Sequence, residues 1–166
     1  MVHLMPPPLL ISDSNILIDL DCCGLLPKVF KLPFQIAVPD VLYLEELSEK
    51  HAELPALGLK VLQFGPNVTS DIMRMRRQYP ASGFLDLTAL AVARSLGADL
   101  LTGDKQLRKI AEAEQQRVRG TIWVMTALVE HKVLSRRHAV DALEVMKSSG
   151  RRLPWKKARR AIEEAR

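Results

Sequence analysis

Hydrophobic positions along the chain fall into two kinds of pattern that alternate. Short continuous apolar runs, too short for helices, predict buried strands at residues 9–12, 34–38, 59–64 and 98–102, with a short edge strand at 117–119. Longer segments with apolar residues at helical spacing predict helices at 16–26, 40–50, 67–78, 86–96, 105–114, 121–133, 135–148 and 155–165. Strands that alternate with helices predict a three-layer α/β/α sandwich with a central, mostly parallel sheet, followed by C-terminal helices.

The stretch 83–104 carries the clearest pattern. From Asp86, apolar residues recur at the i, i+3, i+4, i+7 spacing of one helical face, so this acid heads a buried stripe. Gly97 predicts the helix end, because glycine enters the left-handed conformation without a steric penalty. A short apolar strand follows and ends at Gly103-Asp104, where the next helix begins.

Two acids come at the ends of predicted strands. Asp13 comes after the first strand and Asp104 after the strand at 98–102. Carboxyl ends of parallel strands share one edge of a sheet, and ligands bind outside that edge. Asp86 opens a helix that starts either at this edge or at the opposite one, and the pattern leaves both options open.

Each acid also has an ordinary structural explanation. Asp13 and Asp104 fit helix N-caps, which contribute about 1 kcal/mol each, and Asp86 fits the first turn of a helix, where the helix dipole favours a negative charge. As a group, however, several carboxylates at one edge would repel one another unless a cation joined them. Carboxylate oxygens suit Mg²⁺ or Mn²⁺, and such ions activate water and stabilise charge on a phosphodiester.

Size and composition set wider bounds. The 166 residues are enough for one domain with a substantial core, and 48% of them are hydrophobic. No apolar run reaches the roughly 18–20 residues of a membrane span, and the N-terminus lacks the pattern of a secretory signal. The only cysteines are the neighbours Cys22 and Cys23, which rarely pair, so we expect a reducing cytoplasm.

The positive charge is concentrated at the C-terminal end. Residues 147–166 carry eight Lys or Arg and two Glu, whereas the first 146 residues are nearly neutral. This asymmetry indicates contact with a polyanion or an acidic partner, and a solvated amphipathic helix explains it equally well.

The acidic pattern resembles that of a PIN-domain nuclease. The matching motifs are DSN after the first strand, EEL in the helix at 40–50, and FLDLTALAVARSLGADLLTGDKQL; together the resemblance spans about residues 9–133. It implies the PIN fold and divalent-metal-dependent endoribonuclease activity with Mg²⁺ or Mn²⁺. The segment from GTIWVMTALVEHKVLSRR onward resembles, more weakly, the helical extension of VapC-like toxins of microbial toxin–antitoxin systems.

By position, the resemblance implies that Asp13, Asp86 and Asp104 are the first, third and fourth acids of the metal site. The second acid lies in the EEL triplet; family usage favours Glu46, while helical periodicity does not separate it from Glu45. Thr102 stands where the family often has a hydroxyl beside the site. Lys105, Arg108 and the basic tail are candidates for holding the RNA backbone, a contact without sequence preference.

We therefore expect a nuclease domain at residues 1–133 and a basic helical extension at 134–166. The resemblance also implies an RNA substrate, a cognate antitoxin protein and a homodimer, and we expect no membrane association. Apolar residues in the helices at 121–133 and 135–148 indicate a surface that a second copy would cover, or packing on the sheet of the same chain.

Two alternatives differ in class. A catalytically silent PIN-like module would bind RNA or protein without cleaving it. A phosphatase of the haloacid dehalogenase type would use Asp19-Leu20-Asp21, but Cys23 stands where that family has Thr or Val, and the motif falls inside a predicted helix.

Overall fold

The computed structural model describes residues 5–166. The first four residues, which belong to the predicted domain 1–133 and to the segment without a signal pattern, lie outside the described residues. A five-stranded parallel sheet forms the centre, with the strand order β3-β2-β1-β4-β5. The strands are β1 (Leu9–Ser12), β2 (Gln35–Pro39), β3 (Lys60–Leu62), β4 (Asp99–Leu101) and β5 (Val118–Arg119). The predicted parallel sheet is confirmed.

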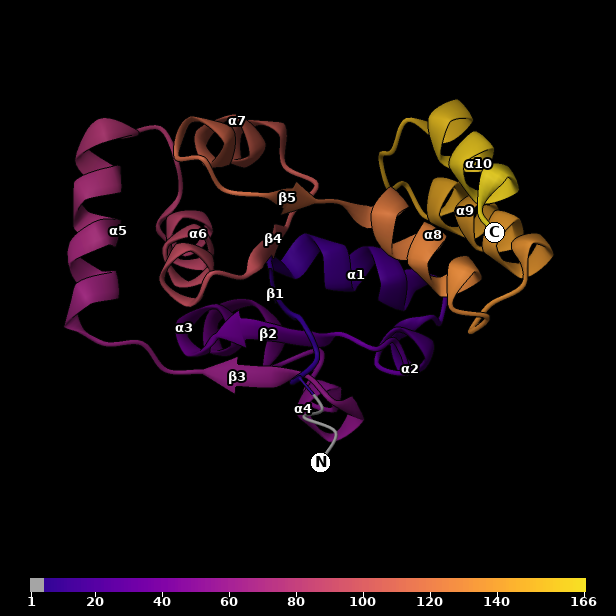
Figure 1. Cartoon of the computed structure of the whole chain (residues 1–166), viewed down its shortest axis with the longest axis horizontal. Coiled ribbons are helices and arrows are strands. Elements are labelled where there is room, and N and C mark those ends of the chain that lie inside the picture. The colour runs from indigo at the N-terminus through magenta and orange to yellow at the C-terminus, as the bar shows by residue number, and fades with distance from the viewer. Residues whose placement is uncertain (1–4) are drawn as a thin grey trace.

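Helices cover the sheet on both faces, which confirms the three-layer sandwich (Figure 1). Helix α6 (Phe84–Leu96) packs against β1, β2 and β4, with α5 (Pro66–Gln78) outside it. Helix α1 (Ser14–Cys22), α2 (Leu26–Val29) and α8 (Thr121–Glu130) form a second layer. Helix α7 (Lys105–Ala113) connects β4 to β5.

The core is built where strands and helices meet. Ile11 and Leu100 on neighbouring strands are fully buried, as are Leu87 and Leu90 on α6 and Leu20 on α1. These residues are the apolar runs and helical stripes of the sequence, which is why the sheet and its covering helices form as predicted.

The strand order reverses between the parallel neighbours β1 and β4. From β1 the chain winds outward to β2 and β3, and then crosses back to β4 and β5 on the other side. The register pairs Ser12 with Leu101, so both strands end together. Such a reversal leaves a crevice at the carboxyl ends of the two strands, and ligands bind there in open parallel sheets.

Two of the predicted helices are shorter in the structure than the sequence pattern indicates. The helix expected at 16–26 ends at Cys22, because Gly24 takes a positive φ of 70° and turns the chain into α2. The helix expected at 40–50 is α3 (Asp40–Leu42) followed by a π-helical stretch at Tyr43–Leu47, and α4 (Leu54–Leu57) precedes β3.

The C-terminal segment is part of the packed structure. Helices α9 (Arg136–Ser148) and α10 (Trp155–Glu164) pack with α8. Ala158 and Ile162 of α10 are fully buried, and Arg136 donates to the carbonyl of Ala165. Among residues 5–166, no helix is long and apolar enough to cross a membrane.

Candidate metal and nucleic-acid site

Asp13 lies at the carboxyl end of β1 and is almost fully buried, with 2% of its surface exposed. Its Oδ1 caps α1 by accepting from the backbone N–H of Ile16 at 3.0 Å. Its own N–H donates to the carbonyl of Leu101 on β4 at 2.9 Å. Its Oδ2 accepts from the hydroxyl of Thr102. Asp13 is therefore the N-cap of α1, and these hydrogen bonds fix its carboxylate at the end of β1.

Asp104 follows β4 at the same edge. Its Oδ1 caps α7 by accepting from the N–H of Leu107 at 2.7 Å. Its backbone N–H donates to the Thr102 hydroxyl oxygen at 3.1 Å. Thr102 is fully buried, so one hydroxyl joins the side chain of Asp13 to the backbone of Asp104.

The remaining predicted acids come from two helices. Glu46 lies on the π-helical stretch, and its Oε2 accepts from the hydroxyl of Ser14, the residue after Asp13. This contact places Glu46, rather than Glu45, beside the first acid. Asp86 lies half-buried in the first turn of α6. Burial raises its pKa, and the charges of Asp104 and Glu46 raise it further, which indicates that α6 starts near the carboxyl edge.

Burial, and then neighbouring carboxylates, raise the pKa values of two of these acids, Asp13 and Asp86. Burial raises the pKa of Asp13 to about 6; the hydrogen bonds from Thr102 and Ile16 oppose this shift, and the charge of Asp86 adds to it. Burial also raises the pKa of Asp86, and the nearby Asp104 and Glu46 raise it further. Full ionisation of this group therefore costs free energy that a bound cation would offset.

The four acids are spread along the edge rather than clustered tightly. Within the part of the chain that the structure describes, only Asp21, His51 and Glu53 bring three ligand atoms within 4.8 Å of one another. In that set Asp21 lies near the opposite end of α1 from Asp13, and His51 Nδ1 is 3.3 Å from Asp21 Oδ2. A wide spacing at the edge suits Mg²⁺, which keeps several waters and takes only one or two carboxylates directly. The donor set therefore fits a hydrated hard cation.

The phosphatase alternative has no support in the structure. Asp19 is buried inside α1, where its Oδ2 accepts from Thr121 at 3.0 Å and its Oδ1 is paired with Arg151. A carboxylate held in this way is not free to attack a phosphate.

Sequence reasoning missed two features. One is the set of Asp21, His51 and Glu53, in which Asp21 comes from α1 and the other two come from the segment between the π-helical stretch and α4. The other is a cavity beside Asp104, which Gly103, Lys105, Arg108, Val118–Trp123, Arg152–Pro154 and Lys157 line. The sequence indicates Lys105, Arg108 and the basic tail as candidates for phosphate contacts. No sequence motif indicates that residues 118–123 line the same cavity.

A parallel sheet with acids at its reversal point, covered by helices on both faces, defines a PIN-like nuclease fold. A family model of PIN domains, DUF3368, matches residues 9–166. The chain belongs to this PIN-domain family, and the family's members are in general nucleases. A search of curated proteins gave no match. The match extends through α10, so the family includes the C-terminal helices as well as the sheet.

Proposed function

We propose that this protein is a divalent-metal-dependent endoribonuclease that hydrolyses RNA phosphodiesters. The observation that carries the proposal is the group of four acids at the reversal point of the sheet. Two of them, Asp13 and Asp86, have raised pKa values because burial and neighbouring carboxylates disfavour their charged forms. The ionised carboxylates repel one another, and a divalent cation bound between them would relieve this repulsion.

In this proposal Asp13, Asp86 and Asp104 hold Mg²⁺ or Mn²⁺, directly or through water. Glu46 completes the shell or orients the attacking water, and the Ser14 hydroxyl fixes its carboxylate. Thr102 keeps Asp13 and Asp104 in register by bonding to both. A bound divalent ion would lower the pKa of a water molecule and stabilise charge on the phosphate.

Further proposals rest on the resemblance to PIN-domain toxins. We propose a VapC-like toxin role with a cognate antitoxin, a cytoplasmic location, and a homodimer. The apolar residues of α8 and α9 do not support the dimer, because Met125, Leu128, Leu143 and Met146 are buried within the single chain. Sedimentation at micromolar concentration tests the dimer, and a monomer with full activity would reject it as a requirement.

The test of the nuclease proposal is RNA cleavage by metal-stripped protein as Mg²⁺ or Mn²⁺ is added. Asp104→Asn keeps the N-cap, because Asn caps as well as Asp, and it removes one charge from the site. Since losing a group that merely orients a metal ligand already costs 10- to 100-fold, we expect cleavage to fall by at least about 100-fold. Thermal stability should hold or rise because repulsion with Asp86 is relieved.

Asp21→Asn is the matched control. It removes the same charge from the surface set of Asp21, His51 and Glu53, and it should leave cleavage unchanged. Normal cleavage by the Asp104 variant would reject the proposed site. No cleavage by the wild type at any metal concentration, together with RNA binding, would favour the silent module.

A further inference from the structure

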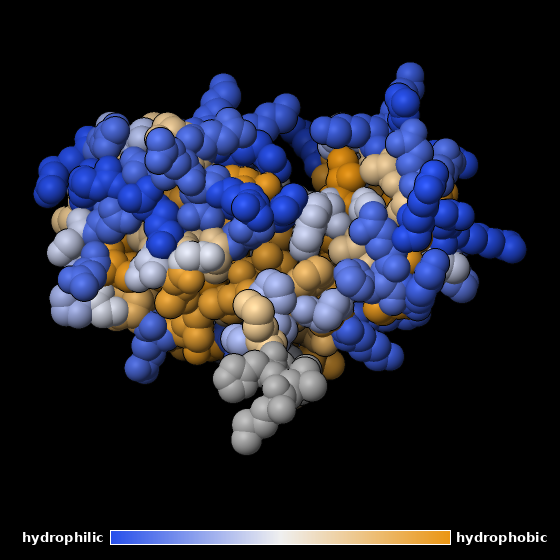
Figure 2. Space-filling view, viewed as in Figure 1, coloured by the Kyte–Doolittle hydropathy of each residue, from blue (hydrophilic) through white to orange (hydrophobic). Residues whose placement is uncertain are grey.

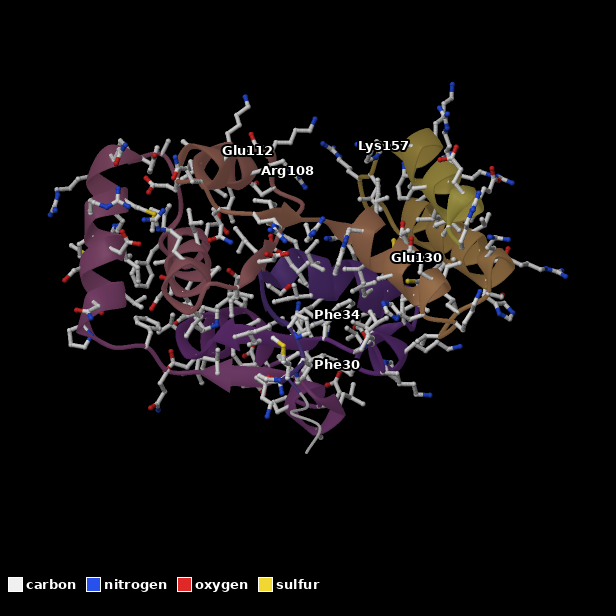
Figure 3. All side chains as sticks on the ribbon, viewed as in Figure 1. Phe30, Phe34, Arg108, Glu112, Glu130 and Lys157 are labelled. Atoms are coloured by element: carbon white, nitrogen blue, oxygen red, sulfur yellow. The ribbon has the colours of Figure 1, made fainter. Side chains whose placement is uncertain are left out.

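A cavity of about 880 Å³ opens beside the acidic edge. One wall is formed by the start of α7 and by β5, and the other by the segment 152–157 that leads into α10. Figure 2 shows a notch between hydrophilic rims at the top of the molecule, in the region where Figure 1 separates α7 from α10. Arg108 comes from the first side and Lys157 from the second (Figure 3).

Positive charge dominates the lining. Five cationic side chains and no acidic residue line the cavity: Lys105, Arg108, Arg119, Arg152 and Lys157. Only Arg119 pairs with a carboxylate among the described residues, with its Nε 3.4 Å from Asp99 Oδ2. Four cations in one hollow therefore lack a neutralising partner within the described chain, and an anionic ligand would supply one.

The cavity also has planar and apolar surfaces. The guanidinium carbon of Arg119 lies 5.1 Å from the ring centroid of Trp123. Phe34 packs against Trp123 with their centroids 5.4 Å apart, which holds this stack in place. Ile122 and Leu153 add apolar area. Single-stranded nucleic acids bind to such a combination, because their bases stack on aromatic rings and guanidinium planes while cations track the backbone.

The cavity is continuous with the acidic site. Gly103 and Lys105, the two neighbours of Asp104, both line it. Arg108 Nη2 is 3.5 Å from the carbonyl of Thr102, the residue whose hydroxyl contacts Asp13. A Cβ on Gly120 would lie 3.2 Å from the same nitrogen, so glycine leaves room for Arg108.

The second wall is anchored to the helix that starts at the site. Arg151, next to Arg152 of the lining, pairs with buried Asp19 on α1. Thr121 of the lining donates to the same carboxylate at 3.0 Å. The start of α8 and the segment that leads into α10 are thus both tied to α1 through Asp19.

We propose that this cavity binds a single-stranded segment of nucleic acid adjacent to the phosphate held at the acidic edge. Lys105, Arg108, Arg152 and Lys157 contact its phosphates, and the Arg119–Trp123 stack receives a base. The choice of RNA as the strand rests on the proposed function, whereas the cavity and its charge do not. An acidic peptide would also match the positive charge of the cavity, but it has no bases to stack on Arg119 and Trp123.

The test measures binding without metal, so that cleavage cannot contribute. Fluorescence anisotropy of a labelled 12-nucleotide oligouridylate in EDTA is compared for the wild type, Arg108→Gln/Lys157→Gln and Lys147→Gln/Lys156→Gln. The last pair removes the same charge from a separate, smaller cavity between α9 and α10. Melting curves establish that each variant is folded, and Lys105→Gln/Arg152→Gln replaces the first pair if it is not.

We expect the cavity pair to weaken binding by at least tenfold, and the control pair by less than twofold. The negative slope of log K against log salt should become shallower by about 1.4 for the cavity pair, because each phosphate contact to a single strand contributes about −0.7. Arg119→Lys keeps the positive charge but removes the planar guanidinium group. It should therefore weaken binding without changing the salt dependence.

Equal effects of the two pairs, or a blunt RNA duplex that binds as tightly as the single strand, would overturn the proposal. So would a cavity variant that keeps the oligonucleotide but loses a labelled oligoaspartate peptide, since the cavity would then be a protein site. The nuclease proposal is separable: a wild type that binds through the cavity but cleaves nothing with Mn²⁺ rejects only that proposal.

Discussion

Thr102 and Asp13 show how the site is organised at the scale of single residues. The hydroxyl of Thr102 donates to Asp13 Oδ2 and accepts from the N–H of Asp104. Because Thr102 is fully buried, water does not compete for these two hydrogen bonds. The position of both acids is therefore set by the fold before any ion binds, which is what a preorganised metal site requires.

Asp13 also makes the stability of the metal-free protein depend on pH. Its pKa rises from 3.8 to about 6 on folding, so the folded state binds the proton more tightly. Proton binding to Asp13 therefore stabilises the folded state, and this contribution is fully present below pH 3.8 and is lost as the pH rises through 6. The loss amounts to at most about 3 kcal/mol, at about 1.4 kcal/mol for each unit of pKa.

Asp13→Asn should remove that dependence. In EDTA at pH 8 we expect the variant to be more stable to urea than the wild type by up to about 3 kcal/mol, and the difference to shrink at pH 5. Addition of Mn²⁺ should stabilise the wild type far more than the variant. A variant that is less stable than the wild type at both pH values would show that the carboxylate is not strained.

At the scale of elements, the reversal between β1 and β4 decides where the site lies. Alternating apolar runs and helical stripes predict this sheet, and the strand-end acids indicate the edge at which we propose the metal site. The position of Asp86 needed the structure, because where α6 starts depends on the long crossover from β3. Glu46 needed it as well, because a π-helical stretch shifts side chains away from the spacing of an α-helix.

The ion pair of Asp19 with Arg151 joins α1 to the start of the C-terminal segment. Arg151→Met would leave a buried carboxylate with only Thr121 as a partner. We expect a loss of about 2–4 kcal/mol in the free energy of unfolding, since Arg151 is partly exposed and a fully buried pair costs more. Urea denaturation measures it.

Arg160→Met is the control, because Arg160 pairs with Glu164 on the exposed face of α10. Such a solvent-exposed pair contributes little to stability, so the free energy of unfolding should barely change. Adding Asp19→Asn to Arg151→Met should recover part of the stability. Similar small effects of both Arg variants would mean that the C-terminal segment is held by its apolar contacts alone.

At the scale of the whole molecule, the basic tail is a structural part of the protein. Its last helix buries Ala158 and Ile162 against α8 and α9, so removal of residues 151–166 would expose core surface. The sequence predicted the charge and the helix, but not this packing. Patterns within one segment do not reveal which distant surface it covers, and the cavity exists only because the tail folds back onto the sheet domain.

The most direct measurement of the central claim is anomalous diffraction from crystals soaked in Mn²⁺. We expect an anomalous peak at the carboxyl edge between Asp13, Asp86 and Asp104, with Glu46 contacting the ion or a water on it. In crystals of the Asp104→Asn variant this peak should weaken or vanish. A peak only at Asp21, His51 and Glu53, or no peak at the edge at saturating Mn²⁺, would contradict the assignment of the acids to a metal-dependent nuclease site.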